Sequence, residues 1–195
     1  MRKKRKIKPF EKLCFHDDFM FGCVMRDKDI CARALECMLG IKIKRIAFVE
    51  PQKSIIPLYT SRSIRLDVYV EGCSTVYDVE IQNRNTHDLG RRTRYYQSMM
   101  DTDTLSRGKS CKDLKDSIII FLCRFDPFKK GIPCYTLKKA CVQDASVETD
   151  DGATVHIFNC KAYAKAEDEN LKVFLKYVQT DKAKGIKLGR SEGES

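Results

Sequence analysis

The sequence lacks the closely spaced cysteine pairs that mark most structural zinc sites. It has ten cysteines and three histidines in 195 residues, but no C-x-x-C pair, and no histidine pairs with a cysteine at the usual ligand spacing. Zinc modules normally show such pairs, whereas free cysteine behaves as a small buried hydrophobic residue. We therefore expect reduced thiols, and neither a disulfide scaffold nor a zinc module.

Long apolar segments are also absent. No run reaches the length of about 18 apolar residues that a membrane-spanning helix needs. The basic residues 1–12 are not followed by the apolar stretch of a secretory signal. These absences predict a cytoplasmic protein without a membrane partner. The length suits one ordinary domain, and we expect a basic tail over 1–15, one domain over 16–179 and a polar, disordered tail over 180–195.

The charge is strongly one-sided. A net charge of +10 and a pI near 9.1 favour a polyanionic partner, because each Lys or Arg that neutralises a phosphate releases condensed counterions. Ribosomal, RNA-binding and membrane-surface proteins share this charge. It therefore supports a nucleic-acid partner without identifying one.

Residues 65–82 predict a β-hairpin with one acidic face. Two alternating segments, RLDVYVE and TVYDVEIQ, flank a short Gly-Cys-Ser connection. In a hairpin centred on this connection, Asp67 lies across from Glu80, and directly opposed side chains share one face of the sheet. The other face is then apolar and suited to a core, with Leu66, Val68, Val70, Val79 and Ile81.

Two opposed carboxylates repel each other unless a positive charge lies between them. Mg²⁺ is commonly held by one or two carboxylates and several waters, so Asp67 and Glu80 are candidate ligands. A solvated acidic strand face is the alternative, and a slip of one residue in register would separate the pair. The spacing alone leaves both interpretations open.

Together with Gln82, these two acids resemble the metal-binding core of the PD-(D/E)XK nuclease superfamily. From about residue 16 to about residue 177 the chain is similar to the recombination-promoting nuclease (Rpn) or transposase family, through the ordered blocks RLDVYVEG, YDVEIQ, RRTRYYQSMMD, LSRGKSCKDLKDSIIIFLCRFDPFKKG and CYTLKKAC. The resemblance implies an α/β fold with a restriction-endonuclease-like core, in which helices flank a central mixed sheet of about four or five strands. Family members commonly continue with further helical sequence, which leaves a short form, a truncation and a homo-oligomer open.

The resemblance implies a divalent-metal-dependent DNA endonuclease associated with recombination or DNA mobility, with Mg²⁺ or Mn²⁺ as cofactor. Asp67, Glu80 and the main-chain carbonyl of Ile81 would hold the ion, and Asp67, Glu80 and Gln82 would be catalytic. Gln82 stands where the superfamily usually has Lys, and a neutral amide orients water without supplying charge. The alternatives are a weak or inactive DNA-binding module with the same fold, and RNA processing on that fold.

A helix is predicted over residues 91–105, with a basic first turn. In the superfamily such a helix packs beside the metal site, which makes Arg91, Arg94, Tyr95 and Gln97 candidate DNA-binding residues. A solvated basic turn with Tyr95 packed in the core is equally compatible with the pattern. An acid before a phenylalanine in the family's first helix matches Asp18, which is a candidate accessory acid or a helix N-cap.

The remaining pattern is coarser. We expect a helix from Asp17 or Asp18 to Gly40 with a break near 26–29. The other expected elements are a short strand within 46–49, a central strand over 117–123 buried on both faces, an edge strand over 134–137, a strand over 154–158 and an amphipathic helix over 167–178.

Overall fold

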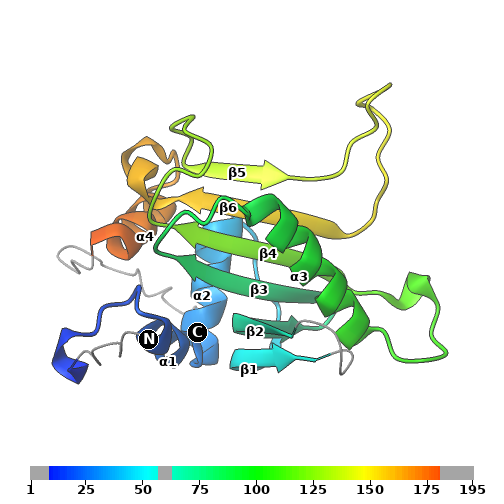
Figure 1. Cartoon of the computed structure of the whole chain (residues 1–195), viewed down its shortest axis with the longest axis horizontal. Helices are drawn as coiled ribbons and strands as arrows, with labels where there is room; N and C mark the ends of the chain where they lie inside the picture. Colours follow the sequence, from blue (N-terminus) through cyan, green and yellow to red (C-terminus); the bar gives the residue numbers. More distant parts are fainter. Residues whose placement is uncertain (1–8, 57–62, 181–195) are drawn as a thin grey trace, which may run out of the picture.

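A mixed six-stranded sheet forms the centre of the computed structural model, which describes residues 9–56 and 63–180. The strand order is β1-β2-β3-β4-β6-β5 (Figure 1). The bounds are β1 (Ile46–Ile55), β2 (Ile64–Gly72), β3 (Thr75–Gln82), β4 (Asp116–Cys123), β5 (Cys134–Leu137) and β6 (Ala153–Asn159). β1 to β3 are antiparallel, β3, β4 and β6 are parallel, and β5 pairs antiparallel with β6. The expected mixed sheet is confirmed, with more strands than the four or five predicted.

Strand β1 is much longer than the sequence pattern predicted. It has ten residues where the pattern predicted only a short strand, and its burial does not alternate. Pro51 lies inside it, and Gln52 has a left-handed φ of 59°. β1 is an edge of the sheet, and an edge strand tolerates proline because its outer side has no ladder to break. The lost alternation explains why its length was not predictable.

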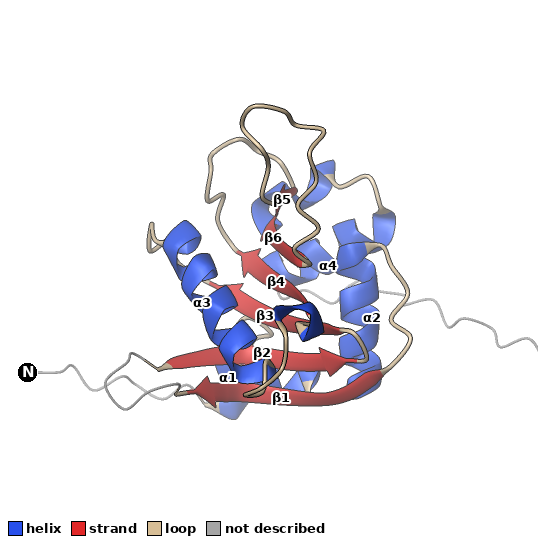
Figure 2. Ribbon diagram, turned by 90° about the vertical axis from the view of Figure 1, so that its right-hand side faces the viewer, coloured by secondary structure: helices blue, strands red, loops and turns tan. Residues whose placement is uncertain are grey.

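Helices cover both faces of the sheet. Their bounds are α1 (Asp18–Met25), α2 (Lys28–Leu39), α3 (Leu89–Thr104) and α4 (Glu169–Thr180), with short 3₁₀ turns η1 (Phe10–Lys12), η2 (Cys111–Asp113) and η3 (Cys160–Lys165). Figure 2 shows α3 on one side of the sheet and α2 and α4 on the other. The expected break between α1 and α2 is confirmed: the Asp27 side chain accepts from the amides of Asp29 and Ile30, which caps α2, and Gly40 ends α2 in the left-handed region.

Strand β4 separates two apolar cores, as its continuous apolar sequence predicted. Ile120 and Leu122 pack in the core under α1, α2 and α4, whereas Ile119 and Phe121 pack in the core under α3. The first core also contains Phe15, which is 5% exposed and contacts Phe21 edge to face with ring centres 5.3 Å apart. The packed region therefore begins before the expected boundary at residue 16.

All ten cysteines are free, as predicted. Cys31, Cys123 and Cys160 are buried, but three others are exposed, so burial holds for only part of the set. Among the helices in residues 9–56 and 63–180, none has the length and apolar character that a membrane crossing requires. The expected tails lie mostly outside the described residues.

Candidate active site

The hairpin of β2 and β3 has the predicted register. Val68 pairs with Val79 and Tyr69 with Asp78, and continuing this register places Asp67 opposite Glu80. At that point side chains replace the backbone ladder: the Asp67 amide donates to Glu80 Oε1 at 2.8 Å, and the Ile81 amide donates to Asp67 Oδ2 at 3.2 Å. Each carboxylate is therefore fixed by a backbone amide of the opposite strand.

The same irregularity corrects the prediction for Leu66. We expected Leu66 to share a face with Val68 and Val70, but it packs in the core under α3 while the two valines pack in the opposite core. The β2–β3 pairing ends at Val68. Both hydrogen bonds across the hairpin at Asp67 join a carboxylate to a backbone amide, where a regular ladder would join two backbone groups. The strand therefore loses its strict alternation at this residue.

Strand β1 adds a contact that the sequence did not indicate. Gln52 Nε2 donates to Asp67 Oδ1 at 3.4 Å, from the residue whose φ is 59°. A residue with a left-handed φ changes the direction of the strand locally. The Asp67 carboxylate is thus held from the strands on both sides of β2.

Burial dominates the electrostatics of the two acids. Glu80 is only 3% exposed, and burial, followed by the charge of Asp67, raises its pKa to about 8. Burial also raises the pKa of Asp67 to about 6, a shift that the Ile81 amide opposes and the charge of Asp18 reinforces. The charged forms are unfavourable here without a cation, because each must leave water beside another negative charge.

Asp78 is a third acid in this group, and the sequence analysis did not select it. It is fully buried, and burial followed by the charges of Glu80 and Asp67 raises its pKa well above the ordinary value. The strand period would have predicted this position, because Asp78, Glu80 and Gln82 follow one another at intervals of two residues and therefore share a face of β3. Asp78 therefore shares the face of β3 that carries Glu80, where burial and the two neighbouring carboxylates disfavour its charged form.

Arg92 of α3 connects to these acids through Gln82. Arg92 Nη2 donates to Gln82 Oε1 at 2.9 Å, and Gln82 Nε2 donates to Glu80 Oε2 at 3.4 Å. The guanidinium also lies 5.4 Å from the centre of the Phe121 ring and 3.6 Å from Asp88 Oδ1. Gln82 thus bridges Glu80 to a fixed positive charge that comes from another element.

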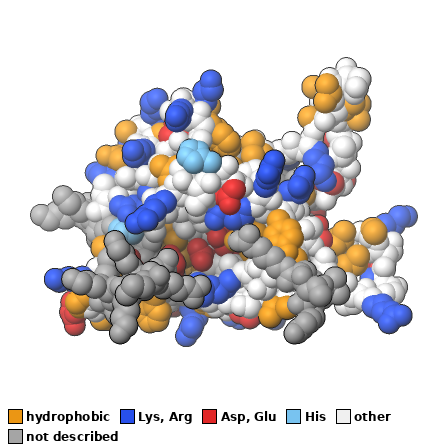
Figure 3. Space-filling view, viewed as in Figure 1, with side chains coloured by type: hydrophobic (Ala, Val, Ile, Leu, Met, Phe, Trp, Pro, Cys, Tyr) orange, Lys and Arg blue, Asp and Glu red, His pale blue; other side chains and the backbone are white. Residues whose placement is uncertain are grey.

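The acids open into a cleft of about 960 Å³ between the end of the hairpin and α3. Four arginines contribute to its lining: Arg65, Arg84, Arg91 and Arg92. Figure 3 shows Asp and Glu side chains near the middle of this face, with Lys and Arg side chains beside them. Asp18 also lines the cleft, from the first turn of α1 rather than as its N-cap.

The predicted DNA-binding residues divide into two pairs. Arg91 and Tyr95 line the cleft, together with Tyr96, but Arg94 and Gln97 are not among the lining residues. Gln97 instead donates to Asp101 Oδ1 at 3.0 Å and contacts Ser117 Oγ on β4. Arg94 and Gln97 therefore do not line this cleft, and a role in DNA binding stays a prediction for all four residues.

Comparison with known proteins places this chain in a family. The family model for the PD-(D/E)XK nuclease family transposase matches residues 15–184. A comparison with curated proteins and one with solved structures gave no match. The matched range includes every strand and all four α-helices described above, and the resemblance expected from the sequence is confirmed. The chain belongs to the PD-(D/E)XK nuclease family transposases.

Proposed function

We propose that the chain is a divalent-metal-dependent DNA endonuclease that acts in recombination or DNA mobility. One observation carries the proposal: Asp67 and Glu80 meet across the hairpin, each held by an amide of the opposite strand, at the base of an arginine-lined cleft. Membership of a nuclease family supports DNA as the substrate. Hydrolysis of phosphodiester bonds is the reaction that this combination of acids and cations suits.

The donor set fits a hard divalent cation. The carboxylates of Asp67 and Glu80 offer oxygen atoms, which Mg²⁺ and Mn²⁺ prefer. The Ile81 amide points toward Asp67, whereas the Gln82 carbonyl accepts from the Arg124 amide on the β4 side. In a strand the N–H and C=O of one residue point to the same side, so the Ile81 carbonyl opens toward Asp67 as a third oxygen donor.

A divalent ion at this position supplies Lewis acidity for a phosphodiester and lowers the pKa of a water nucleophile. The chain's own residues supply the rest. Arg92 provides the positive charge that a lysine at position 82 would have carried, and a guanidinium can stabilise the charge that develops on a phosphate. Gln82 positions Arg92 against Glu80, and Asp18 adds an accessory acid at the cleft wall.

Plasmid nicking tests the proposal. We expect the purified protein to nick supercoiled DNA in Mg²⁺ or Mn²⁺ but not in EDTA, and Asp67→Asn to lose this activity because a metal ligand loses its charge. The measurement is the conversion of supercoiled to open-circular plasmid over time. Equal nicking by wild type and variant would contradict the proposal, and salt-sensitive DNA binding without nicking in either metal would favour the binding-module alternative.

Arg91 gives a prediction for DNA affinity. It lines the cleft on α3, whereas Arg94 carries the same charge on the same helix outside the lining. Arg91→Gln should weaken binding to a short duplex and reduce the slope of log K against log salt by about 1, because one phosphate contact is lost. Arg94→Gln is the matched control. Fluorescence anisotropy in EDTA over a range of salt concentrations measures both, and equal slopes for the two variants would contradict the placement.

A further inference from the structure

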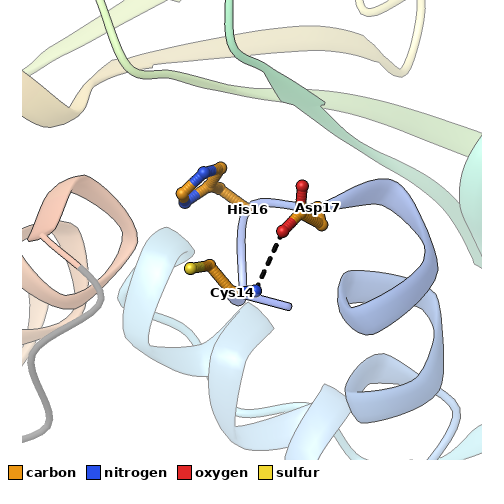
Figure 4. A group of neighbouring side chains, drawn as sticks. All are labelled: Cys14, His16 and Asp17. Carbon is orange, nitrogen blue, oxygen red and sulfur yellow. Dashed lines mark hydrogen bonds between the residues drawn. The ribbon is translucent and has the colours of Figure 1, made fainter. Parts of the chain in front are cut away.

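A tight turn ahead of α1 brings three potential metal ligands together outside the cleft lining. One ligand atom each of Cys14, His16 and Asp17 lies within 4.8 Å of the others. Figure 4 shows the three side chains extending from this one turn, with the hydrogen bond between Cys14 and Asp17. We propose that the three residues form a zinc-binding site, separate from the oxygen donors of Asp67 and Glu80.

The turn is built independently of any ion. The Asp17 amide donates to the Cys14 carbonyl at 2.9 Å, and the Cys14 amide donates to Asp17 Oδ2 at 2.9 Å. Between them, Phe15 is anchored in the core, with its ring centre 5.2 Å from that of Tyr177. Two hydrogen bonds and a buried aromatic ring therefore fix the backbone that carries the ligands, so less conformational entropy is lost when they close on an ion.

The ligand types select the metal. Thiolate and imidazole favour Zn²⁺ over Mg²⁺, and zinc binds sulfur, nitrogen and carboxylate oxygen at about 2.0 to 2.3 Å in tetrahedral geometry. Such ligand atoms lie roughly 3.3 to 3.8 Å apart, so modest side-chain rotation closes the present set. Binding displaces the Cys14 thiol proton to solvent. The group has three members among the described residues, which leaves the fourth position for water.

The sequence shows no histidine at the usual ligand spacing from a cysteine and predicts no zinc module, so the proposed site would be an exception to that prediction. Paired zinc ligands are usually separated by two or more residues, whereas Cys14, His16 and Asp17 fall within four consecutive residues. The turn makes this short spacing workable, because it returns residue 17 to residue 14.

The position of the turn suggests what the ion does. Asn83, directly after β3, donates from Nδ2 to the His16 carbonyl at 2.8 Å, and both Asn83 and Asp18 line the cleft. An ion held by the turn would stiffen the junction between the start of α1 and the end of β3. This effect on the fold does not involve the chemistry of the cleft, so its test does not require nuclease activity.

Cobalt substitution provides that test. The full-length protein, stripped with EDTA under a non-thiol reductant, is titrated with Co²⁺ and then with Zn²⁺. We expect one equivalent of Co²⁺ to give a thiolate-to-cobalt charge-transfer band, which Zn²⁺ then removes. An oxygen-only site at Asp67 and Glu80 cannot produce this band, so the result is independent of the proposed nuclease function.

Variants locate the site. Cys14→Ser should abolish the band, and His16→Ala should weaken Zn²⁺ affinity by more than the roughly 10- to 100-fold that loss of an outer-shell partner costs. Cys134→Ser is the matched control, because Cys134 Sγ lies 4.0 Å from His156 Nδ1 and forms a second cysteine–histidine pair within the part of the chain that the structure describes. Zn²⁺ should also raise the Tm of wild type by more than that of Cys14→Ser, which keeps the oxygen donors of Asp67 and Glu80 but lacks the thiolate. A missing band in wild type, or a band that survives Cys14→Ser, would overturn the proposal.

Discussion

Replacing Arg92 with glutamine is expected to slow metal-dependent nicking by roughly 10²- to 10³-fold, the loss that follows removal of one preorganised charge-stabilising donor. Arg92 donates to Gln82 at 2.9 Å and lies against Phe121, so its guanidinium is held in one place before substrate arrives. Preorganised charge acts most strongly in a water-poor site. The rate of open-circle formation at saturating DNA measures the effect.

A compensating variant makes this prediction specific. In the Arg92→Gln background, Gln82→Lys restores a positive charge at the position where the superfamily usually carries lysine, and we expect it to recover part of the lost rate. Arg94→Gln removes an exposed charge from the same helix and should have a much smaller effect. Tm values of the variants separate a loss of charge from a loss of folding. Nicking by Arg92→Gln near the wild-type rate would contradict a role for this guanidinium.

The pairing of Asp67 with Glu80 was predictable because it depends on local rules. A short turn fixes the register of a hairpin, and the period of two then fixes which side chains meet. The departure at Leu66 was not predictable by the same rules, since the strand loses its alternation only because two carboxylates capture backbone amides across the hairpin. The hydrogen bonds of the two site carboxylates therefore interrupt the alternation that the sequence predicts.

The position of Arg92 on α3 could have been predicted in part from the helical period. Three of the four buried residues of α3, Leu89, Thr93 and Met100, mark one stripe, and the fourth, Met99, lies on the same side of the helix as Arg92. At 3.6 residues per turn, Arg92 and Tyr95 lie on one flank of this stripe, and Arg94 and Gln97 lie on the other. The helical period therefore separates the cleft residues from the rest. Which flank faces the acids depends on tertiary packing, which the pattern of one helix does not contain.

The remaining differences also have physical causes. The length of β1 was hidden by Pro51 and the left-handed Gln52, since an edge strand need not follow the usual alternation. The turn that gathers Cys14 and His16 depends on the anchoring of Phe15 by residues of α1 and α4. Contacts between distant segments decide both features, so spacing rules alone could not reveal them.

Glu80→Gln is expected to abolish nicking and also to stabilise the metal-free protein above neutral pH. Burial raises the pKa of Glu80 from 4.5 to about 8, so between these values the folded protein retains a proton that the unfolded chain releases. The contribution of Glu80 to the free energy of unfolding is then largest below about pH 4.5 and falls as the pH rises toward about 8, by about 1.4 kcal/mol per unit of pKa difference. Glutamine keeps an acceptor for the Asp67 amide but removes the charge.

Urea unfolding in EDTA at about pH 5 and about pH 8.5 measures the difference in the free energy of unfolding between the two pH values. This difference should amount to several kcal/mol in wild type and shrink in Glu80→Gln. It should persist in the control Glu148→Gln, which changes an exposed carboxylate. Mg²⁺ should recover the lost stability of wild type at the higher pH but not change that of Glu80→Gln. Equal free energies of unfolding of wild type at both pH values would contradict the raised pKa of Glu80.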